Sequence, residues 1–206
     1  SFASLWLAPR LSGVRAALGR LDVRIVASGP LDALREDGVD LAISYRKGAP
    51  QDLAAIDLFT ERVIPVCAPS LLAGMADADQ PTVLARLPLL HIDPTMGDDV
   101  YPAWRDGFAA AGLARKDLDH GPRFGLTVVA AQAAIAGMGA LLASELVLRR
   151  HIDPGQLAEI ARAVPALTIS RRLVWPQDGP KAKRAAGVAA ALAAAAGSSI
   201  DGALPG

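Results

Sequence analysis

Apolar residues in the first eighteen positions recur every three or four residues, which is the spacing of one face of a helix. This face consists of Leu5, Ala8, Leu11, Val14 and Leu18. The spacing predicts a helix over residues 1–18. Apolar residues then alternate over residues 21–27, and this alternation predicts a strand.

The same reading continues beyond the turn at Ser28-Gly29-Pro30. Residues 31–37 read as a short helix that ends at Gly38, and residues 39–45 read as a second strand. The chain therefore opens in the order helix, strand, helix, strand. This order predicts an α/β fold with parallel pairing.

The rest of the chain gives further elements of both kinds. Predicted strands cover 54–59, 62–68, 88–92, 122–125, 140–144 and 167–175, and the first two are separated by a turn at Thr60-Glu61. Predicted helices cover 69–75, 80–87, 101–112 and 127–136, another starts at Ser144, and an alanine-rich one covers 180–197.

The Gly137-Met138-Gly139 segment follows the predicted helix 127–136 and precedes a strand. A phosphate cradle has the reverse order, because its glycines lie at the N-terminus of a helix. We therefore interpret the glycines as a helix C-cap and a tight turn. At the other end of this helix, Gly125-Leu126-Thr127 brings free backbone N–H groups and one hydroxyl together, which suits an anion. The simpler alternative is that Thr127 only caps its helix, as Ser1 would cap the first.

Composition limits the possible functions. Apolar residues make up 52% of the 206 residues and aromatic residues only 4%, so the core is predicted to be aliphatic. Lys plus Arg and Asp plus Glu are 21 each, and this balance argues against nucleic-acid binding by the chain alone. The clusters at residues 149–151 and at Arg171-Arg172 are interpreted as solvated ends of elements.

The single cysteine, Cys67, excludes an internal disulfide and fits a reducing compartment. Its apolar neighbours predict a buried thiol rather than a reactive one. No secretory signal and no segment of membrane-spanning length is visible. The chain begins at Ser1 without a methionine, so we expect residues upstream of it to be missing.

Catalytic and metal sites are not predicted. The three histidines lack partners at metal-ligand spacing, and there is no nucleophile motif. Paired acidic residues at 98–99 and 117–119 are typical of solvated turns. Trp6 and Trp104 fall at core positions. No cofactor is expected.

An ordered set of segments now becomes informative: SFASLWLAPRL, DVRIVASGPLDALREDGVDLAISY, LFTERVIPVCAPSLL, GPRFGLTVVAAQAAIAGMGALL and RRLVWPQ. Together they resemble the effector-binding domain of LysR-type transcriptional regulators, in the branch of the glycine-cleavage activator and the β-lactamase regulator. The resemblance runs from Ser1 to about Pro180. No short motif within it is specific, whereas the ordered set is.

The resemblance implies a periplasmic-binding-protein-like fold (type 2) of two α/β lobes joined by a two-strand hinge. Lobe I would contain residues 1–66 and 172–206, and lobe II residues 67–171. The hinge crossings would lie near Val66 and Arg171.

The family binds a small effector in the cleft between its lobes, and the resemblance implies the contacting residues by position. They are Ser1, Phe2, Ser28, Tyr45, Pro65, Cys67, Phe124, Gly125, Thr127 and Trp175. Ser1 and Thr127 are the strongest candidates, as hydrogen-bond donors to a carboxylate or amide. Trp175 packed against the hinge is an equal alternative to a ligand contact.

The family's winged helix-turn-helix and linker helix are absent from this chain, so DNA binding is expected only through that missing domain. Two further departures are Gly125-Leu126, where the branch often carries acidic residues, and a C-terminal helix without the branch's aromatic end. The first departure argues against a cationic effector. The second means that the family pattern does not predict how the last helix packs. The resemblance also implies a cytoplasmic homodimer, with tetramers when full length, and no enzyme activity. The alternative is an exported solute-binding protein of the same fold.

Overall fold

The computed structural model describes residues 2–19, 22–26, 34, 39–45, 51–73, 80–92, 101–160 and 167–200. The chain divides into two compact units. Unit 1 contains Glu61–Thr95 and Tyr101–Ile169, and unit 2 contains Phe2–Thr60 and Ser170–Gly206. Strands β2 (Leu53–Cys67) and β7 (Leu167–Pro176) each contribute residues to both units.

Unit 1 is built on a mixed sheet in the order β2-β5-β3-β4, with β6 on the other edge of β2. Strands β5 and β6 pair antiparallel with β2, whereas β3 pairs parallel with both β4 and β5. Its other strands are β3 (Leu89–Ile92), β4 (Arg123–Phe124), β5 (Ala140–Ser144) and β6 (Ala158–Glu159). Its helices are a 3₁₀ turn (Pro69–Leu71), α2 (Gln80–Arg86), α3 (Trp104–Ala110), α4 (Thr127–Ile135) and α5 (Glu145–Ile152).

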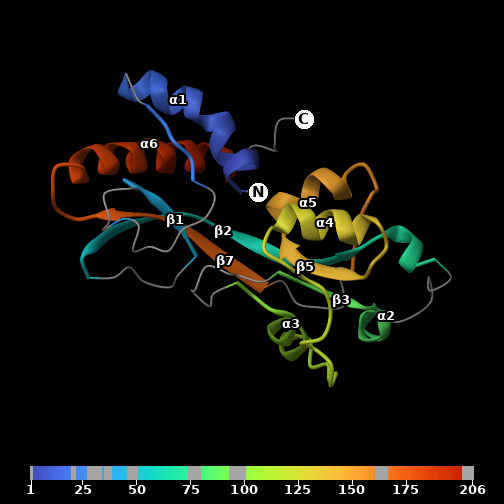
Figure 1. The fold of residues 1–206 in the computed structure, drawn as a ribbon. Helices are drawn as coiled ribbons and strands as arrows, with labels where there is room; N and C mark the ends of the chain where they lie inside the picture. Colours follow the sequence, from blue (N-terminus) through green and yellow to red (C-terminus); the bar gives the residue numbers. More distant parts are fainter. Residues whose placement is uncertain are drawn as a thin grey trace. The chain divides into compact units, whose positions relative to one another are not determined.

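The core of unit 1 forms where α4 and α5 pack on β5 (Figure 1). It combines aliphatic residues from the strands with the alanines of α4, and Phe124 packs against its rim. Small alanine side chains let a helix approach the sheet closely. Helix α3 is anchored by Trp104, whose Nε1 donates a hydrogen bond to the Leu90 carbonyl oxygen at 2.9 Å. The core is thus aliphatic, as the composition predicted.

The end of α4 confirms the interpretation of its glycines. The Gly137 N–H donates to the Ala134 carbonyl at 3.0 Å, and the Met138 N–H donates to the Ala133 carbonyl at 3.1 Å. These two bonds form a Schellman cap, which requires the positive φ of 79° at Gly137. At Gly139 a Cβ atom would lie 2.4 Å from the Pro88 carbonyl oxygen. Both glycines therefore serve backbone geometry.

Unit 2 contains β1 (Ala42–Ser44), β7 and the first part of β2, with β7 between the other two. Strand β1 pairs antiparallel with β7, with Ile43 opposite Leu173. A π-helical turn (Ala3–Leu7) runs directly into α1 (Ala8–Leu18). Helices α1 and α6 (Ala182–Ile200) contact each other, and Figure 1 shows them side by side.

Three sequence predictions need correction. Residues 22–26 are exposed and belong to no strand, so their alternation does not reflect a buried face. The two strands predicted around Thr60-Glu61 are one continuous strand, β2, because two polar residues in an extended chain do not by themselves make a turn. The described pairings are mixed rather than parallel. Except for Leu34, the short helix predicted at 31–37 lies outside the described residues.

Candidate functional site

The candidate residues of unit 1 gather around the start of α4 and the second half of β2. Strand β4 ends at Phe124 and the helix begins at Thr127, with exposed Gly125 and Leu126 between them. Leu126 is the N-cap residue, and its apolar side chain offers no capping group. Thr127 is therefore the first helical residue rather than the cap, and its side chain is half-buried. The first backbone N–H groups of a helix have no intrahelical acceptor, so this end of α4 suits an anion.

Pro65 and Cys67 lie on β2 and are buried. The Pro65 carbonyl accepts a hydrogen bond from the Ile160 N–H at 2.9 Å. The Cys67 side chain is 0% exposed, and burial raises the pKa of its thiol to about 11. The thiol is therefore protonated at neutral pH, and the prediction that Cys67 is a buried side chain is confirmed.

The candidate residues of unit 2 include two aromatic rings that hold one guanidinium group between them. The Cζ atom of Arg171 lies 4.1 Å from the centre of the Phe2 ring and 4.7 Å from the centre of the Tyr45 ring. Phe2 precedes the first helical turn, Tyr45 directly follows β1, and Arg171 belongs to β7. Such stacking is favourable because the ring faces are electron-rich.

The ring of Phe2 also contacts a side chain of the following helical segment. It stacks on Trp6 with 5.1 Å between ring centres, and Arg10 lies 4.6 Å from the centre of the Trp6 ring. Phe2, Trp6 and Arg10 follow one another at intervals of four residues, so they lie on one face of the helix. Trp6 is 3% exposed, so its predicted core position is confirmed.

Sequence reasoning missed Arg171. It treated Arg171-Arg172 as a solvated pair, whereas Arg171 is only 2% exposed. The signal was present in the alternation of β7, where Ile169, Arg171 and Leu173 are buried in turn, followed by Val174. His151 is also buried, with Nδ1 2.8 Å from the Gln156 side-chain oxygen, so the cluster at residues 149–151 is not fully solvated either.

Three candidate residues remain: Trp175, Ser1 and Ser28. Trp175 is half-buried near the end of β7. Ser1 and Ser28 lie outside the described residues. Within unit 1, the structure brings together Phe124, Gly125 and Thr127, and within unit 2 it brings together Phe2 and Tyr45.

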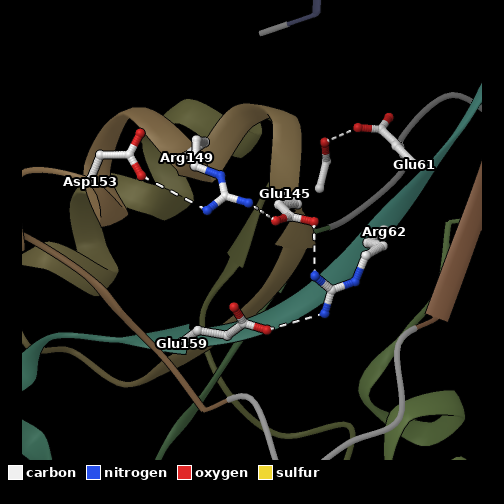
Figure 2. A network of polar contacts seen from close by, with 7 residues as sticks. Glu61, Arg62, Glu145, Arg149, Asp153 and Glu159 are labelled. Carbon is white, nitrogen blue, oxygen red and sulfur yellow. Dashed lines mark hydrogen bonds and ion pairs between the residues drawn. The ribbon is translucent and has the colours of Figure 1, made fainter. Parts of the chain in front are cut away.

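A polar network lies on β2 in unit 1, and Figure 2 shows the side chains of Glu61 and Arg62 from which it extends. The Ser144 hydroxyl donates to the carboxylate of Glu61, which is buried, and the Ser144 N–H donates to the Tyr101 hydroxyl oxygen at 2.6 Å. On the neighbouring residue, Arg62 makes ion pairs with Glu145 and Glu159. Sequence spacing gave no sign of this network, because Arg62 and Glu159 are 97 residues apart in the sequence.

Metal-ligating side chains do not cluster within the part of the chain that the structure describes. No group of three or more His, Cys, Asp or Glu side chains there is placed to hold a metal ion. His91 Nε2 lies 2.9 Å from the His120 carbonyl oxygen, a structural contact between β3 and the turn before β4. Among these same residues, no helix is both long and apolar enough to cross a bilayer.

Sequence comparisons identify relatives of this chain. The model of the LysR substrate binding domain matches residues 1–197. The chain is 36% identical over 157 residues to the glycine cleavage system transcriptional activator of Escherichia coli, covering 76% of this chain and 50% of that protein. It is 30% identical over 181 residues to the transcriptional activator AmpR of Rhodobacter capsulatus, covering 87% of this chain and 58% of that protein. The chain spans about half the length of the curated relatives it matches.

Solved structures share the fold. The effector domain of the regulator AmpR of Pseudomonas aeruginosa has a TM-score of 0.75 at 24% identity, covering 96% of this chain and 91% of that one. The regulatory domain of CrgA from Neisseria meningitidis has a TM-score of 0.74 at 19% identity, covering 94% and 93%. The predicted α/β fold of the periplasmic-binding-protein type is confirmed. The chain belongs to the LysR substrate-binding domain family.

Proposed function

We propose that this chain is the effector-sensing domain of a LysR-type transcriptional regulator. The observation that carries the proposal is its 36% identity, over 76% of its length, to a transcriptional activator of this family. A small effector would bind between a lobe of residues 1–66 and 172–206 and a lobe of residues 67–171. Binding would change the equilibrium between two arrangements of the lobes, and thereby DNA binding by the full-length protein.

The proposed effector contacts are those implied by the family resemblance. Two observations support a role for the described ones. The start of α4 presents uncapped backbone N–H groups beside Thr127, and these favour a carboxylate or another acceptor. Phe2 and Tyr45 are held at a common guanidinium, so their rings are fixed before a ligand arrives. We add Arg171 to the proposed site because it fixes both rings.

We also propose that the full-length protein is a cytoplasmic homodimer that forms tetramers, contacts DNA through a separate domain and does not act as an enzyme. Relatives that are transcriptional regulators support this. The zero net charge supports DNA contact through another domain rather than through this one.

The coding DNA upstream of the Ser1 codon tests the regulator proposal directly. A regulator requires a basic helix-turn-helix and a linker helix there, about ninety residues in all. A short apolar signal peptide in that position would instead show an exported solute-binding protein.

The proposed site is tested by thermal unfolding with a panel of the twenty proteinogenic amino acids and benzoate. A compound at about 100 times its Kd stabilises the fold by about 2.7 kcal/mol. We expect Thr127→Val to weaken the binding of a compound found in this way about tenfold, by loss of one hydrogen bond. The matched control is Thr82→Val, at an exposed position of helix α2 in the same unit. Equal effects of the two substitutions would remove Thr127 from the site.

A further inference from the structure

Arg62 lies at the branch point of an ion-pair network in unit 1 (Figure 2). Its Nη1 lies 3.2 Å from Glu145 Oε2, and its Nη2 lies 3.3 Å from Glu159 Oε1. Glu145 in turn pairs with Arg149, which lies 3.9 Å from Asp153. A single guanidinium on β2 therefore joins the first turn of α5 and the strand β6.

Strand β6 is short and lies between two buried apolar residues, Leu157 and Ile160, each 1% exposed. It has two residues, and the register places Val66 opposite Glu159 and Cys67 opposite Ala158. Beyond it, the Ile160 N–H donates to the Pro65 carbonyl. Short edge pairings of this kind are weak, and the ion pair of Glu159 with Arg62 adds a charged contact to the pairing.

The charges of the network are partly shielded from water. Glu145 and Glu159 have side-chain exposures of 16% and 23%, and Arg62 has 48%. Ion pairs that join in a network and lose solvent are worth more than isolated surface pairs. Glu145 also lies in the first turn of α5, where a negative charge is favourable.

We propose that Arg62 is the centre of an ion-pair clamp that holds β6 and the start of α5 on β2, and that this clamp sets how often this edge of unit 1 opens. The clamp weakens as ionic strength rises, because the Debye length falls from about 10 Å at 0.1 M salt to about 3 Å at 1 M. The opening rate of this edge is therefore salt-dependent. This inference does not depend on the proposed effector.

The chain contains its own reporter of this opening. Cys67 is its only cysteine, is fully buried, and lies opposite Ala158 of β6. When β6 separates from β2, the thiol becomes reachable by a thiol reagent. The rate of Cys67 modification by DTNB at fixed pH therefore measures the opening.

The experiment compares the wild-type chain with Arg62→Met, Glu159→Gln and their double substitution. We expect each single substitution to speed DTNB modification about five-fold at 50 mM NaCl. The double substitution should be no faster than Arg62→Met, because both remove the same pair. Raising NaCl to 1 M should bring the wild-type rate close to that of Arg62→Met and leave the Arg62→Met rate unchanged.

Arg105→Met is the matched control. It also removes one guanidinium from unit 1, and the Arg105–Asp119 pair at 2.7 Å has exposures of 69% and 65%. We expect its modification rate to equal that of wild type. A faster rate in this control, or a wild-type rate in Arg62→Met, would overturn the clamp.

Hydrogen exchange followed by mass spectrometry separates local opening from loss of global stability. In Arg62→Met we expect faster exchange in peptides that cover residues 62–67 and 156–160, with unchanged exchange in β3 (Leu89–Ile92). An equal increase in all of these peptides would show a general destabilisation and would contradict the proposal.

Discussion

Arg62 and Arg171 occupy equivalent places on the two strands that pass through both units, in contrasting surroundings. Arg62 is the second residue of unit 1 on β2, and Arg171 is the second residue of unit 2 on β7. Arg62 is half-exposed and faces carboxylates, whereas Arg171 is 2% exposed and lies between two aromatic rings.

This contrast shows that burial decides how one side chain stabilises a strand. Attraction between partly exposed charges is reduced by water and by salt, so the Arg62 pairs stabilise unit 1 modestly and in a salt-dependent way. A buried guanidinium stacked on rings adds packing and cation–π attraction, which salt screens much less. The two connecting strands should therefore respond differently to the same perturbations.

The largest effect is expected for Arg171→Ala, which removes the group between Phe2 and Tyr45. We expect the free energy of unfolding to fall by about 3 kcal/mol, through a cavity and lost stacking, with little change between 0.1 M and 1 M NaCl. Urea unfolding at both salt concentrations measures this. The control Arg172→Ala removes an arginine that pairs with exposed Asp57, and should cost about 0.5 kcal/mol. A strong salt dependence for Arg171→Ala would break the contrast.

The next effect is a dependence of stability on pH, and its source is Cys67, which lies in unit 1. The folded-state pKa of Cys67 is raised from 9.0 to about 11 by burial. A raised pKa gives stability that is fully present below pH 9 and is lost as pH rises from about 9 to 11. We expect the stability difference between wild type and Cys67→Ala to shrink by about 2 kcal/mol over this range. Parallel curves from urea unfolding between pH 8 and 11 would contradict the raised pKa.

A smaller effect is expected at the buried end of the network in unit 1. Ser144→Ala removes the hydroxyl that donates to the buried Glu61 carboxylate, and should cost about 1.5 kcal/mol. Its counterpart in unit 2 is Ser170→Ala, which removes the exposed contact between the Ser170 and Thr60 hydroxyls at 3.1 Å. That change should cost less than about 0.5 kcal/mol, since water replaces the lost partner. Equal costs in urea unfolding would show that burial is not what separates these hydroxyls.

The smallest effect is expected for the equilibrium stability of Arg62→Met. Two partly exposed pairs are lost, so we expect a cost of about 1 kcal/mol at 50 mM NaCl, falling towards zero at 1 M. Urea unfolding of both proteins at the two salt concentrations measures the change. A cost that persists at 1 M NaCl would show that Arg62 stabilises through packing, as Arg171 does, and the contrast would then disappear.

Much of the fold follows from local patterns. The spacing of apolar residues correctly predicted helix within residues 1–18. The face that it predicted to be buried is only partly so, because Val14 is buried whereas Leu18 is 40% exposed. The helices predicted over 127–136 and 180–197 are confirmed as α4 and α6. Continuous apolar segments predicted β3 and β5, because central strands are buried on both faces. The position of Gly137 after the helix was enough to predict a cap, because its geometry involves only neighbouring residues.

Local patterns failed where distant residues decide the outcome. The alternation at residues 22–26 has the same local form as that of β7, yet only β7 has paired strands on both sides. Thr60-Glu61 resembles a turn, but Glu61 is held in an extended strand by Ser144, 83 residues away. Arg171 was predicted to be solvated, but it is enclosed by Phe2 and Tyr45, which are distant in the sequence.

The sequence by itself determined the α/β class, the aliphatic core, the inert thiol and the family, because these depend on composition, local spacing and the order of segments. Only the tertiary structure decided which polar side chains are buried and which charges meet. The burial of Arg171 and the two ion pairs of Arg62 depend on residues brought together from separate elements. The free energy of a charge depends on its distance to other charges and to water, and neither distance is encoded in neighbouring residues.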